Sequence, residues 1–369
     1  MSSSSSSFPR LTPSSILHFQ FSSWYPIFSS LSLKSTILRP LPQDFVDYLR
    51  DDAEGVFLPE GSDDVPVEST LSDDEGEQDE FEEEEDDNDE RTSPRRRQFA
   101  FPELDSQIRE IIKTHGAVFP KLNFSSPKDA SWILPQSSPC KCTSPADVYM
   151  LLKSSDFITH DLTAESVFSG CSTTATTTTN TELEPLYQLE LVLRKWYPVD
   201  RSRELRCFVR ENALIGISQR DTNYYDFLND ASTQARIVRS VQGFWENHIK
   251  TKWAGSPDYT FDLLLTRDLS RGHILDFNPY APRTDPLLFS YEELSALALE
   301  PHSETETPEL RVIDSRAHPA AISSAPANQH NMIPFEALSL SSGRDIEEFA
   351  DAWKDEIVQS VVDRDSRVN

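Results

Sequence analysis

The residues best suited to chemistry are Asp276 and Asn278, which stand two positions apart in the apolar segment 274–279. A second apolar run, 259–265, precedes them across a short polar turn, and this pattern predicts a β-hairpin. Side chains two apart on a strand share a face, so Asp276 and Asn278 point the same way and Asp262 can join them from the preceding strand. Three hard oxygen ligands on one patch of sheet suit Mg²⁺ held with a phosphate. A solvated strand face, or polar residues serving the following turn, would give the same pattern.

Cationic side chains gather near the strands that precede this hairpin. They are Lys121, Lys128, Arg194, Lys195, Arg206 and Arg220. A triphosphate in a partly desolvated cleft needs several cations and a metal to offset its charge. Each of these residues taken alone could simply pair with a carboxylate on the surface of an acidic chain. Arginine and glutamate alternate on the strands beside the carboxylate hairpin. This joint pattern makes an anion-binding site an equal alternative to surface ion pairs.

Several familiar active-site patterns are missing from the sequence. The 10 glycines include no G-x-G-x-x-G, and Gly55 and Gly61 are one residue too far apart for a P-loop. The eight histidines show neither HExxH nor Cys-His spacing, and no nucleophilic triad is visible. The triplet 276–278 is similar to the kinase Asp-Phe-Gly but lacks the accompanying His-Arg-Asp and glycine-rich loops. A Walker-type NTPase, a Rossmann dehydrogenase and a protein kinase are therefore disfavoured, and a nucleotide must be held in another way.

The charge of the chain is concentrated in one segment. The 369 residues carry a net charge of −28, and residues 63–90 contain 17 acidic residues and no lysine or arginine, which leaves −11 for the rest. Such a run repels itself and is expected to stay disordered, either as a solubilising spacer or as an arm that binds a partner. The remainder is mildly acidic, which argues against a broad nucleic-acid surface.

Cysteine usage and hydropathy indicate the compartment. Four cysteines in a chain of this length do not make a disulfide framework, and the pair Cys140 and Cys142 lacks the second pair that a structural zinc site needs. No apolar run approaches the roughly 18 residues of a membrane span. We therefore expect reduced thiols, no membrane segment and a cytoplasmic protein.

The elements that must position the candidate residues can be read from apolar periodicity. Helices are predicted over 104–112, 144–154 and 232–252, with another short one after a capping box at 290–293; strands are predicted over 187–197, 204–210, 213–219 and the two hairpin segments. Helices mixed with hairpin-type antiparallel strands indicate the α+β class rather than a doubly wound sheet.

The chain is expected to consist of one body with added segments. Residues 1–15 are a Ser-rich, disordered start, and 16–300 form the body, interrupted by the disordered acidic insert 60–97 and a Thr-rich loop at 163–184. Residues 301–342 are a linker, and 343–369 form a final amphipathic helix and tail with Trp353 on the apolar side. That helix either packs on the body or docks on a partner.

Four sequence blocks resemble the cell division cycle protein 123 family. They are Phe21 to Pro26, Phe119 to Asn123 continuing through Pro127 to Ala130, Leu193 to Tyr197 continuing through Glu204 to Arg210, and Asp276 to Pro279. The likeness covers roughly residues 16–60 and 98–295, in the same order as in the family. The Ser-rich start, the Thr-rich insert and the tail beyond residue 300 depart from it.

The resemblance implies an ATP-grasp-like fold, in which two α+β lobes clamp a nucleotide, and an assembly chaperone that acts as a monomer. Its partner would be the γ subunit of eukaryotic translation initiation factor 2, which the family joins to the α subunit in support of translation initiation and the cell cycle. By match, the residues at ATP would be Lys121, Asn123, Ala130, Arg194, Lys195, Tyr197, Glu204, Arg206, Arg220, Asp262, Asp276 and Asn278. The last three of these would hold Mg²⁺, in agreement with the hairpin pattern.

Three functions stay open at this point. The leading hypothesis is an ATP- and Mg²⁺-binding chaperone, because no general base or substrate carboxylate site is evident. An ATP-grasp ligase or phosphotransferase would need the same metal and cations, so the site residues alone cannot separate it from the chaperone. The third hypothesis is an acidic scaffold whose carboxylates are merely solvated.

Overall fold

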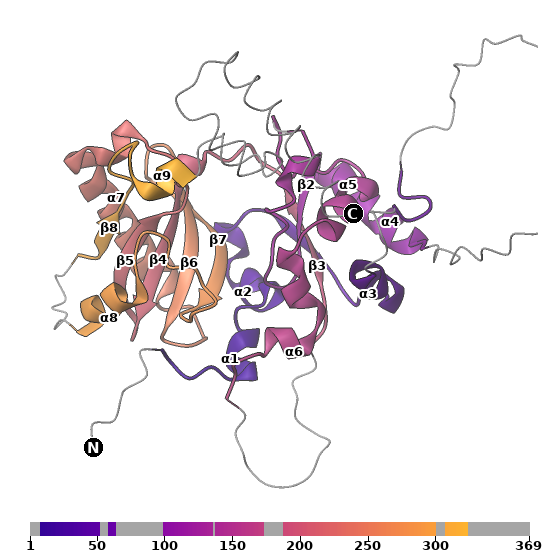
Figure 1. Cartoon of the computed structure of the whole chain (residues 1–369), viewed down its shortest axis with the longest axis horizontal. Helices are drawn as coiled ribbons and strands as arrows, with labels where there is room; N and C mark the ends of the chain where they lie inside the picture. Colours follow the sequence, from indigo (N-terminus) through magenta and orange to yellow (C-terminus); the bar gives the residue numbers. More distant parts are fainter. Residues whose placement is uncertain are drawn as a thin grey trace, which may run out of the picture.

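Two β-sheets, each covered by helices, make up the computed structural model of the chain, which describes residues 8–51, 58–63, 99–135, 137–172, 187–299 and 307–323 (Figure 1). One sheet has three strands in the order β1-β3-β2, and the other has five in the order β7-β6-β4-β5-β8. All pairings are antiparallel except the parallel pair of β5 and β8. The mixture of helices with hairpin-connected strands confirms the predicted α+β class.

The three-stranded lobe contains the first half of the body. Its elements are β1 (Ser35–Leu38), α3 (Gln43–Arg50), α4 (Pro102–His115), β2 (Val118–Lys121), η2 (Ser131–Ile133), α5 (Pro145–Lys153), η3 (Phe157–Leu162), α6 (Ala164–Val167) and β3 (Leu191–Lys195). Helix α5 begins where the sequence predicted: the Ser144 hydroxyl accepts from the Asp147 amide, and the Asp147 carboxylate accepts from the Ser144 amide.

The five-stranded lobe contains the second half. Its elements are η4 (Arg201–Arg203), β4 (Glu204–Arg210), β5 (Ala213–Gln219), η5 (Asp226–Asn229), α7 (Ala231–Phe244), the π-helical turn η6 (Trp245–Ile249), β6 (Tyr259–Leu265), β7 (Gly272–Pro279), α8 (Tyr291–Leu299), β8 (Glu309–Arg311) and α9 (Pro319–Ser323). The predicted hairpin is β6-β7, and it places Asp262 directly opposite Asp276. The predicted capping box before α8 is also present, between Ser290 and Glu293.

The N-terminal helices connect the two lobes. Helices α1 (Pro13–Leu17) and α2 (Phe21–Phe28) and the turn η1 (Ser29–Leu31) precede the first strand, yet α2 lies beside β7 of the other sheet (Figure 1). Trp24 and Phe28 each have a ring centroid 5.3 Å from that of Phe277 on β7. Val192 of β3 belongs to the same apolar cluster, so the core of the five-stranded lobe extends to the first sheet.

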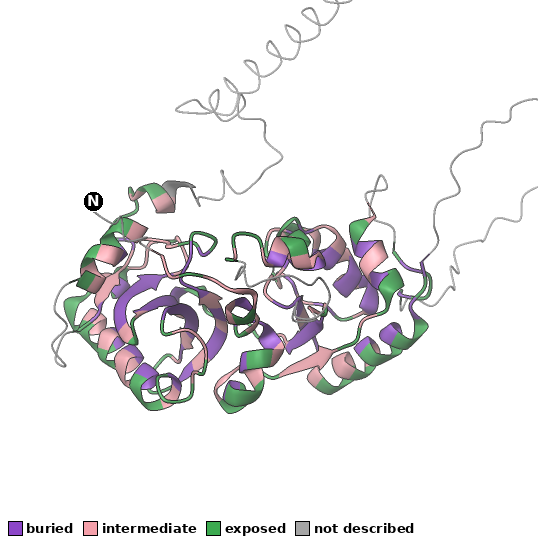
Figure 2. Ribbon diagram, turned by 90° about the horizontal axis from the view of Figure 1, so that it is seen from below, coloured by how far each residue is buried: buried purple, intermediate pink, exposed green. Residues whose placement is uncertain are grey.

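Buried residues concentrate on the strands and on the inner faces of the helices, and exposed residues lie on the outer faces (Figure 2). The three-stranded lobe has its own apolar cluster, in which Phe45, Tyr48, Phe101 and Tyr149 are in mutual ring contact. Burial of aromatic side chains of this size dominates the stability of a core. Each lobe can therefore hold its sheet rigid at the boundary between the two.

Three segments that the sequence predicted to lack secondary structure contain short elements. In the Ser-rich start, Thr12 and Ser15 form a capping box for α1; in the Thr-rich loop, Thr163 caps α6; and the range expected to be linker contains β8 and α9. Serine and threonine reduce helix propensity in the middle of a helix but stabilise its first turn, which composition alone does not distinguish.

Two other predicted boundaries differ. The strand predicted over 187–197 is confined to Leu191–Lys195, and the helix predicted over 232–252 begins after the N-cap Asp230 and changes to a π-helical turn after Phe244. Most of the acidic insert, the end of the Thr-rich loop and the whole of 343–369 lie outside the described residues. No helix among the described residues is long and apolar enough to cross a membrane.

Candidate functional site

A cleft of about 740 Å³ lies between the two sheets. Side chains from β2, β3, β4, β6 and β7 line it, together with the loops that follow β2, β3 and β5. Nine of the predicted site residues are among those that line it: Arg194, Lys195, Tyr197, Glu204, Arg206, Arg220, Asp262, Asp276 and Asn278. Residues that are up to 84 positions apart in the sequence are thus brought to one surface by the packing of the two lobes.

Strand alternation decides which side chains reach the cleft. On β4, Glu204 and Arg206 face it, whereas Leu205 and Cys207 are buried in the core. On β7, Asp276 and Asn278 face it, while Phe277 between them packs under α2. The predicted period of two is therefore confirmed on β4 and over 276–278 of β7, while Leu275, at the register shift next to Asp276, also lines the cleft.

Asp262 is the point at which the charges of the cleft converge. Both of its carboxylate oxygens accept from the Arg206 guanidinium, at 2.8 and 2.9 Å, and Arg220 Nε lies 3.2 Å from Asp262 Oδ2. Burial by itself would raise the pKa of Asp262, but the two guanidinium groups outweigh it and lower the pKa well below its usual range. Asp262 is consequently ionised at any physiological pH. Arg220 also donates to Glu204 at 3.1 Å, which connects β4 to the end of β5.

A second charged pair lies deeper in the molecule. Lys121 is fully buried, and its ammonium contacts Asp276 Oδ2 at 3.1 Å and the Phe124 carbonyl oxygen at 3.1 Å. Lys121 and Arg194 both lie over the ring of Phe21, each 5.3 Å from its centroid. The aromatic ring and one carboxylate partly compensate two buried cations, which is a weaker arrangement than two paired salt bridges.

Two guanidinium nitrogens in the cleft lack a hydrogen-bond acceptor among the described residues: Arg194 Nε and Arg220 Nε. Arg194 uses Nη2 to donate to the Leu275 carbonyl at 2.8 Å, and the close approach of Arg220 Nε to Asp262 lacks hydrogen-bond geometry. Unpaired donors buried in a protein cost free energy. An anion in the cleft would supply the missing acceptors.

Lys128 supplies a cation whose charge depends on pH. Its side chain keeps 48% of its surface exposed, and its ammonium is 4.0 Å from Glu204 Oε2. Desolvation by the surrounding residues, followed by repulsion from Arg220, lowers the pKa of Lys128 to about 8. A group of this kind is protonated at neutral pH and responds strongly to a nearby anion.

Three predicted site residues are not among those that line the cleft. Lys121 does not line the cleft, because its ammonium is buried behind Asp276. Asn123 is also buried, and its side chain donates to the Gln188 carbonyl and accepts from the Glu190 amide, so it organises the loop before β3. Ala130 is fully buried in the core of the three-stranded lobe. The sequence predicted the end of β2 and the loop after it as part of the site, but it could not show which of these side chains are buried.

Other lining residues were not predicted. Aromatic and polar side chains come from loops and from the first residues of the short helices η3 and η4: Phe157, Trp196, Asp200, Arg201, Asp221 and Asn223. Phe157 is 59% exposed, which is unusual for a phenylalanine and could have been suspected only from the polar residues around it. These segments have no apolar periodicity, so no sequence pattern indicates which of their side chains point into the cleft.

The three predicted metal ligands lie at the junction of β6 and β7, and their chemistry fits Mg²⁺ unequally. Both oxygens of Asp262 accept from Arg206 at 2.8 and 2.9 Å, whereas those of Asp276 accept from the single ammonium of Lys121 at 3.4 and 3.1 Å, and Asn278 also lines the cleft. No group of three or more His, Cys, Asp or Glu side chains among the described residues could hold a metal alone. Mg²⁺ usually takes one or two carboxylates and completes its octahedron with phosphate and water oxygens, which this donor set permits.

The chain is similar to known proteins over most of its length. The sequence model of the D123 family matches residues 24–341. The chain belongs to the D123 family. The translation initiation factor eIF2 assembly protein of Schizosaccharomyces pombe is 35% identical over 346 residues, which span 94% of this chain and 97% of the relative. The protein of the same name from Xenopus laevis is 37% identical over 345 residues, spanning 92% and 95%.

Other members of the D123 family carry the name that the sequence blocks suggested. Cell division cycle protein 123 of Yarrowia lipolytica is 34% identical over 337 residues, which span 90% of this chain and 80% of the relative. The solved structure of Cdc123 from Schizosaccharomyces pombe superposes with a TM-score of 0.61 at 33% identity, covering 83% of this chain and 99% of that one. The resemblance found in the four sequence blocks is therefore confirmed.

Proposed function

We propose that this protein binds ATP with Mg²⁺ and acts as an assembly factor for eukaryotic translation initiation factor 2. Relatives that match over nearly the whole chain are named as assembly proteins of that factor, which supports a role in its assembly. The partner would be the γ subunit, held until the α subunit joins, and the protein would work as a monomer in the cytoplasm. The interlobe cleft would serve as an ATP-grasp-type clamp, in which the nucleotide orders the surface that meets the partner.

The observation that carries the nucleotide proposal is the set of unsatisfied and pH-sensitive cations in one cleft. Arg194, Arg220 and Lys128 approach the cleft from three different segments, and two of them retain a buried nitrogen without an acceptor. Polyphosphate oxygens are suitable acceptors for such an array, because arginine binds them as a fork and lysine as a point charge. Lys195 and Tyr197 form a cation–π pair at the cleft, with Tyr197 38% exposed, and a base could stack on this pair.

Mg²⁺ would be held by Asp276 and Asn278 together with phosphate oxygens, with Asp262 contributing negative charge from behind its arginine partners. The metal would neutralise part of the phosphate charge. Lys121 would then fix the orientation of the Asp276 carboxylate, since its ammonium lies 3.1 Å from Asp276 Oδ2. A buried lysine that orients a metal-binding carboxylate acts as the outer shell of the site.

The test is calorimetric titration of ATP with and without Mg²⁺ on the full chain. Asn278→Ala and Asp276→Asn should each weaken Mg²⁺-dependent binding at least tenfold, about 1.4 kcal/mol. Asn at 276 keeps an acceptor for Lys121, whereas Ala would leave that buried ammonium unpaired and threaten the fold. Glu292→Ala, an exposed carboxylate on α8, is the matched control and should bind as wild type does. Unchanged affinity in both cleft variants would refute the metal site.

A ligase or phosphotransferase would use the same cations, so turnover must be measured separately. We expect tight binding with negligible release of ADP, because four carboxylates that line the cleft, Asp200, Glu204, Asp262 and Asp276, are each engaged by a cation. The fifth, Asp221, accepts from the backbone and side chain of Asn223. Release of ADP that rises with an added acceptor protein would favour the enzyme.

A further inference from the structure

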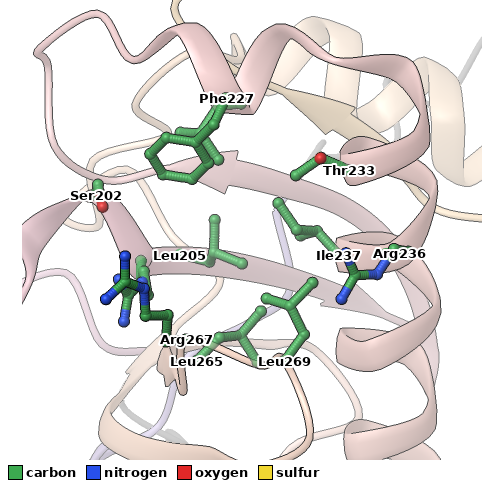
Figure 3. A pocket seen from close by; sticks show the side chains of 11 residues that line it. Ser202, Leu205, Phe227, Thr233, Arg236, Ile237, Leu265, Arg267 and Leu269 are labelled. Carbon is green, nitrogen blue, oxygen red and sulfur yellow. The ribbon is translucent and has the colours of Figure 1, made fainter.

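A second cavity, of about 190 Å³, lies on the five-stranded lobe between β4, β6 and α7 (Figure 3). Its floor is apolar and contains Leu205, Ile237, Leu265 and Leu269, and Leu228 is a further apolar lining residue. Phe227 forms one wall and is 47% exposed. Binding sites for drug-sized ligands and cofactors usually exceed about 300 Å³, so this cavity has room for an inserted side chain rather than for a cofactor.

The rim of this cavity is cationic although the chain is acidic. Arg203, Arg236 and Arg267 are among the lining residues, and no acidic residue is. Arg236 and Arg267 stand on opposite sides of the apolar floor (Figure 3), and Arg267 is close enough to Asp200 to help lower the pKa of that carboxyl. Arg203 forms an ion pair with Asp200 at 2.7 Å. Three guanidinium groups thus line an apolar pocket, and two of them share the carboxylate of Asp200, an arrangement complementary to a peptide that presents an apolar side chain between carboxylates.

The chain itself passes close to this cavity near its C-terminal end. Asn229, two residues after Phe227, donates through Nδ2 to the Ile313 carbonyl at 3.0 Å. The amide of Ile313 in turn donates to Gln219 Oε1 at 3.0 Å. Ile313 is therefore held beside the cavity wall, and the last described residue, Ser323, lies ten positions after it.

The sequence beyond Ser323 contains a segment of the required chemistry. Residues 345–356 include six acidic residues and one lysine, with Ile346, Phe349 and Trp353 among them. The 22 residues between Ser323 and Ile346 can span at most roughly 70 Å when extended, so they do not restrict access to the cavity. A tether of this length gives a local concentration on the order of millimolar, so even a weak contact would be populated.

We propose that residues 345–356 bind in cis to the cavity between β4, β6 and α7. One of the apolar side chains enters the floor, and the flanking carboxylates pair with Arg236 and Arg267. The five-stranded lobe thereby holds the C-terminal segment, and any protein that binds this segment must compete with the cavity for it.

The experiment uses the full chain and a fluorescent peptide corresponding to residues 344–358. The tail variant Phe349→Ser with Trp353→Ser frees the cavity, so the peptide should bind it at least about tenfold more tightly than it binds wild type. Hydrogen exchange should also become faster in α7 and η5 of the tail variant. Arg236→Glu with Arg267→Glu should abolish peptide binding, and a peptide carrying Glu347→Lys and Glu348→Lys should restore it on that variant.

The matched control is Arg239→Glu with Arg271→Glu, which makes the same charge change on α7 and on the β6–β7 turn but outside the cavity lining. It should retain the exchange protection of wild type. Equal peptide affinity for wild type and the tail variant would overturn the proposal. Protection that grows with protein concentration would also overturn it, because the tail would then occupy the cavity of a second copy.

Discussion

Asp262 is the residue on which the cleft depends electrostatically. It is buried and shared by Arg206 and Arg220, so its charge is compensated twice over. A buried pair of this kind costs desolvation free energy and contributes little net stability, but loss of one partner would leave a buried charge without compensation. The two guanidinium groups are also anchored elsewhere, Arg206 to the Asp285 carbonyl in the loop after β7 and Arg220 to Glu204 on β4. Asp262 is therefore best understood as the residue that positions the cations.

Lys128 gives the cleft a testable pH dependence. Its pKa is lowered to about 8 by desolvation and by Arg220, below the ordinary lysine value. A bound phosphate favours the protonated amine, so ATP binding should be complete below pH 8 and weaken as the pH rises through that value. For one linked proton the affinity should fall up to about tenfold per pH unit above pH 8. Calorimetry from roughly pH 7 to 9.5 measures this slope.

Lys128→Arg is the control for this prediction, because arginine stays charged over the whole range and should bind ATP with a flat pH profile. A decline of equal steepness in the variant would assign the titration to another group. The same titration affects the free energy of unfolding in the opposite direction. Because the pKa of Lys128 is lowered in the folded chain, the unfolded chain binds more protons between about pH 8 and the ordinary lysine pKa. The free energy of unfolding therefore rises with pH over that range.

Among the elements, helix α5 shows how local sequence fixes a boundary. Ser144 and Asp147 satisfy each other's amide groups at its start, and the helix buries Val148, Tyr149 and Leu152 against the three-stranded sheet. Ser144→Ala removes the side-chain acceptor and should lower the free energy of unfolding by about 1 kcal/mol. Ser144→Asp keeps an acceptor at the N-cap and should restore most of it. Urea titration of both variants measures the difference, and equal midpoints would show that packing alone fixes the helix.

The elements also show what the sequence could and could not predict. The β6–β7 hairpin was predicted because two apolar runs of seven or eight residues flank a short polar turn and are adjacent in sequence. Strand β8 has three residues and pairs with β5 more than ninety positions earlier, so neither its length nor its partner leaves a local pattern. The same limit applies to the site: Asp262, Asp276 and Asn278 followed from strand alternation, whereas the inward orientation of Asn123 depends on the segment just before β3, which lies far along the chain.

At the scale of the molecule, the cleft exists because two separately packed lobes share α2. Trp24 and Phe28 pack on Phe277, and Phe21 of the same helix lies under Lys121 and Arg194. The apolar contact that joins the lobes thus also supports the cations of the site. A change in the angle between the sheets would move these cations relative to Asp276, so the charges of the cleft and the arrangement of the lobes are mechanically linked.

Removing the acidic insert should leave the two lobes and the cleft intact, because the residues that flank the insert are bonded to each other. The Glu60 amide donates to the Phe99 carbonyl at 2.8 Å, and Glu60 forms a β-bridge with Ala100. Replacing residues 63–90 by a short Gly-Ser linker should therefore leave the free energy of unfolding within about 0.5 kcal/mol of wild type. ATP affinity at 0.15 M salt should change by less than about twofold, because the Debye length there is about 8 Å.

ATP affinity measured at low ionic strength separates an effect of the charge of the insert from an effect of its length. The deletion removes 17 of the 62 acidic residues, so the repulsion of an anionic nucleotide should weaken and ATP affinity should rise at low ionic strength. A variant of unchanged length, with the same 17 residues replaced by Ser and Gln, should show the same rise if charge alone is responsible. A tenfold loss of affinity in the deletion at 0.15 M salt, without loss in the neutral variant, would mean that the length of the insert helps to hold the lobes in place.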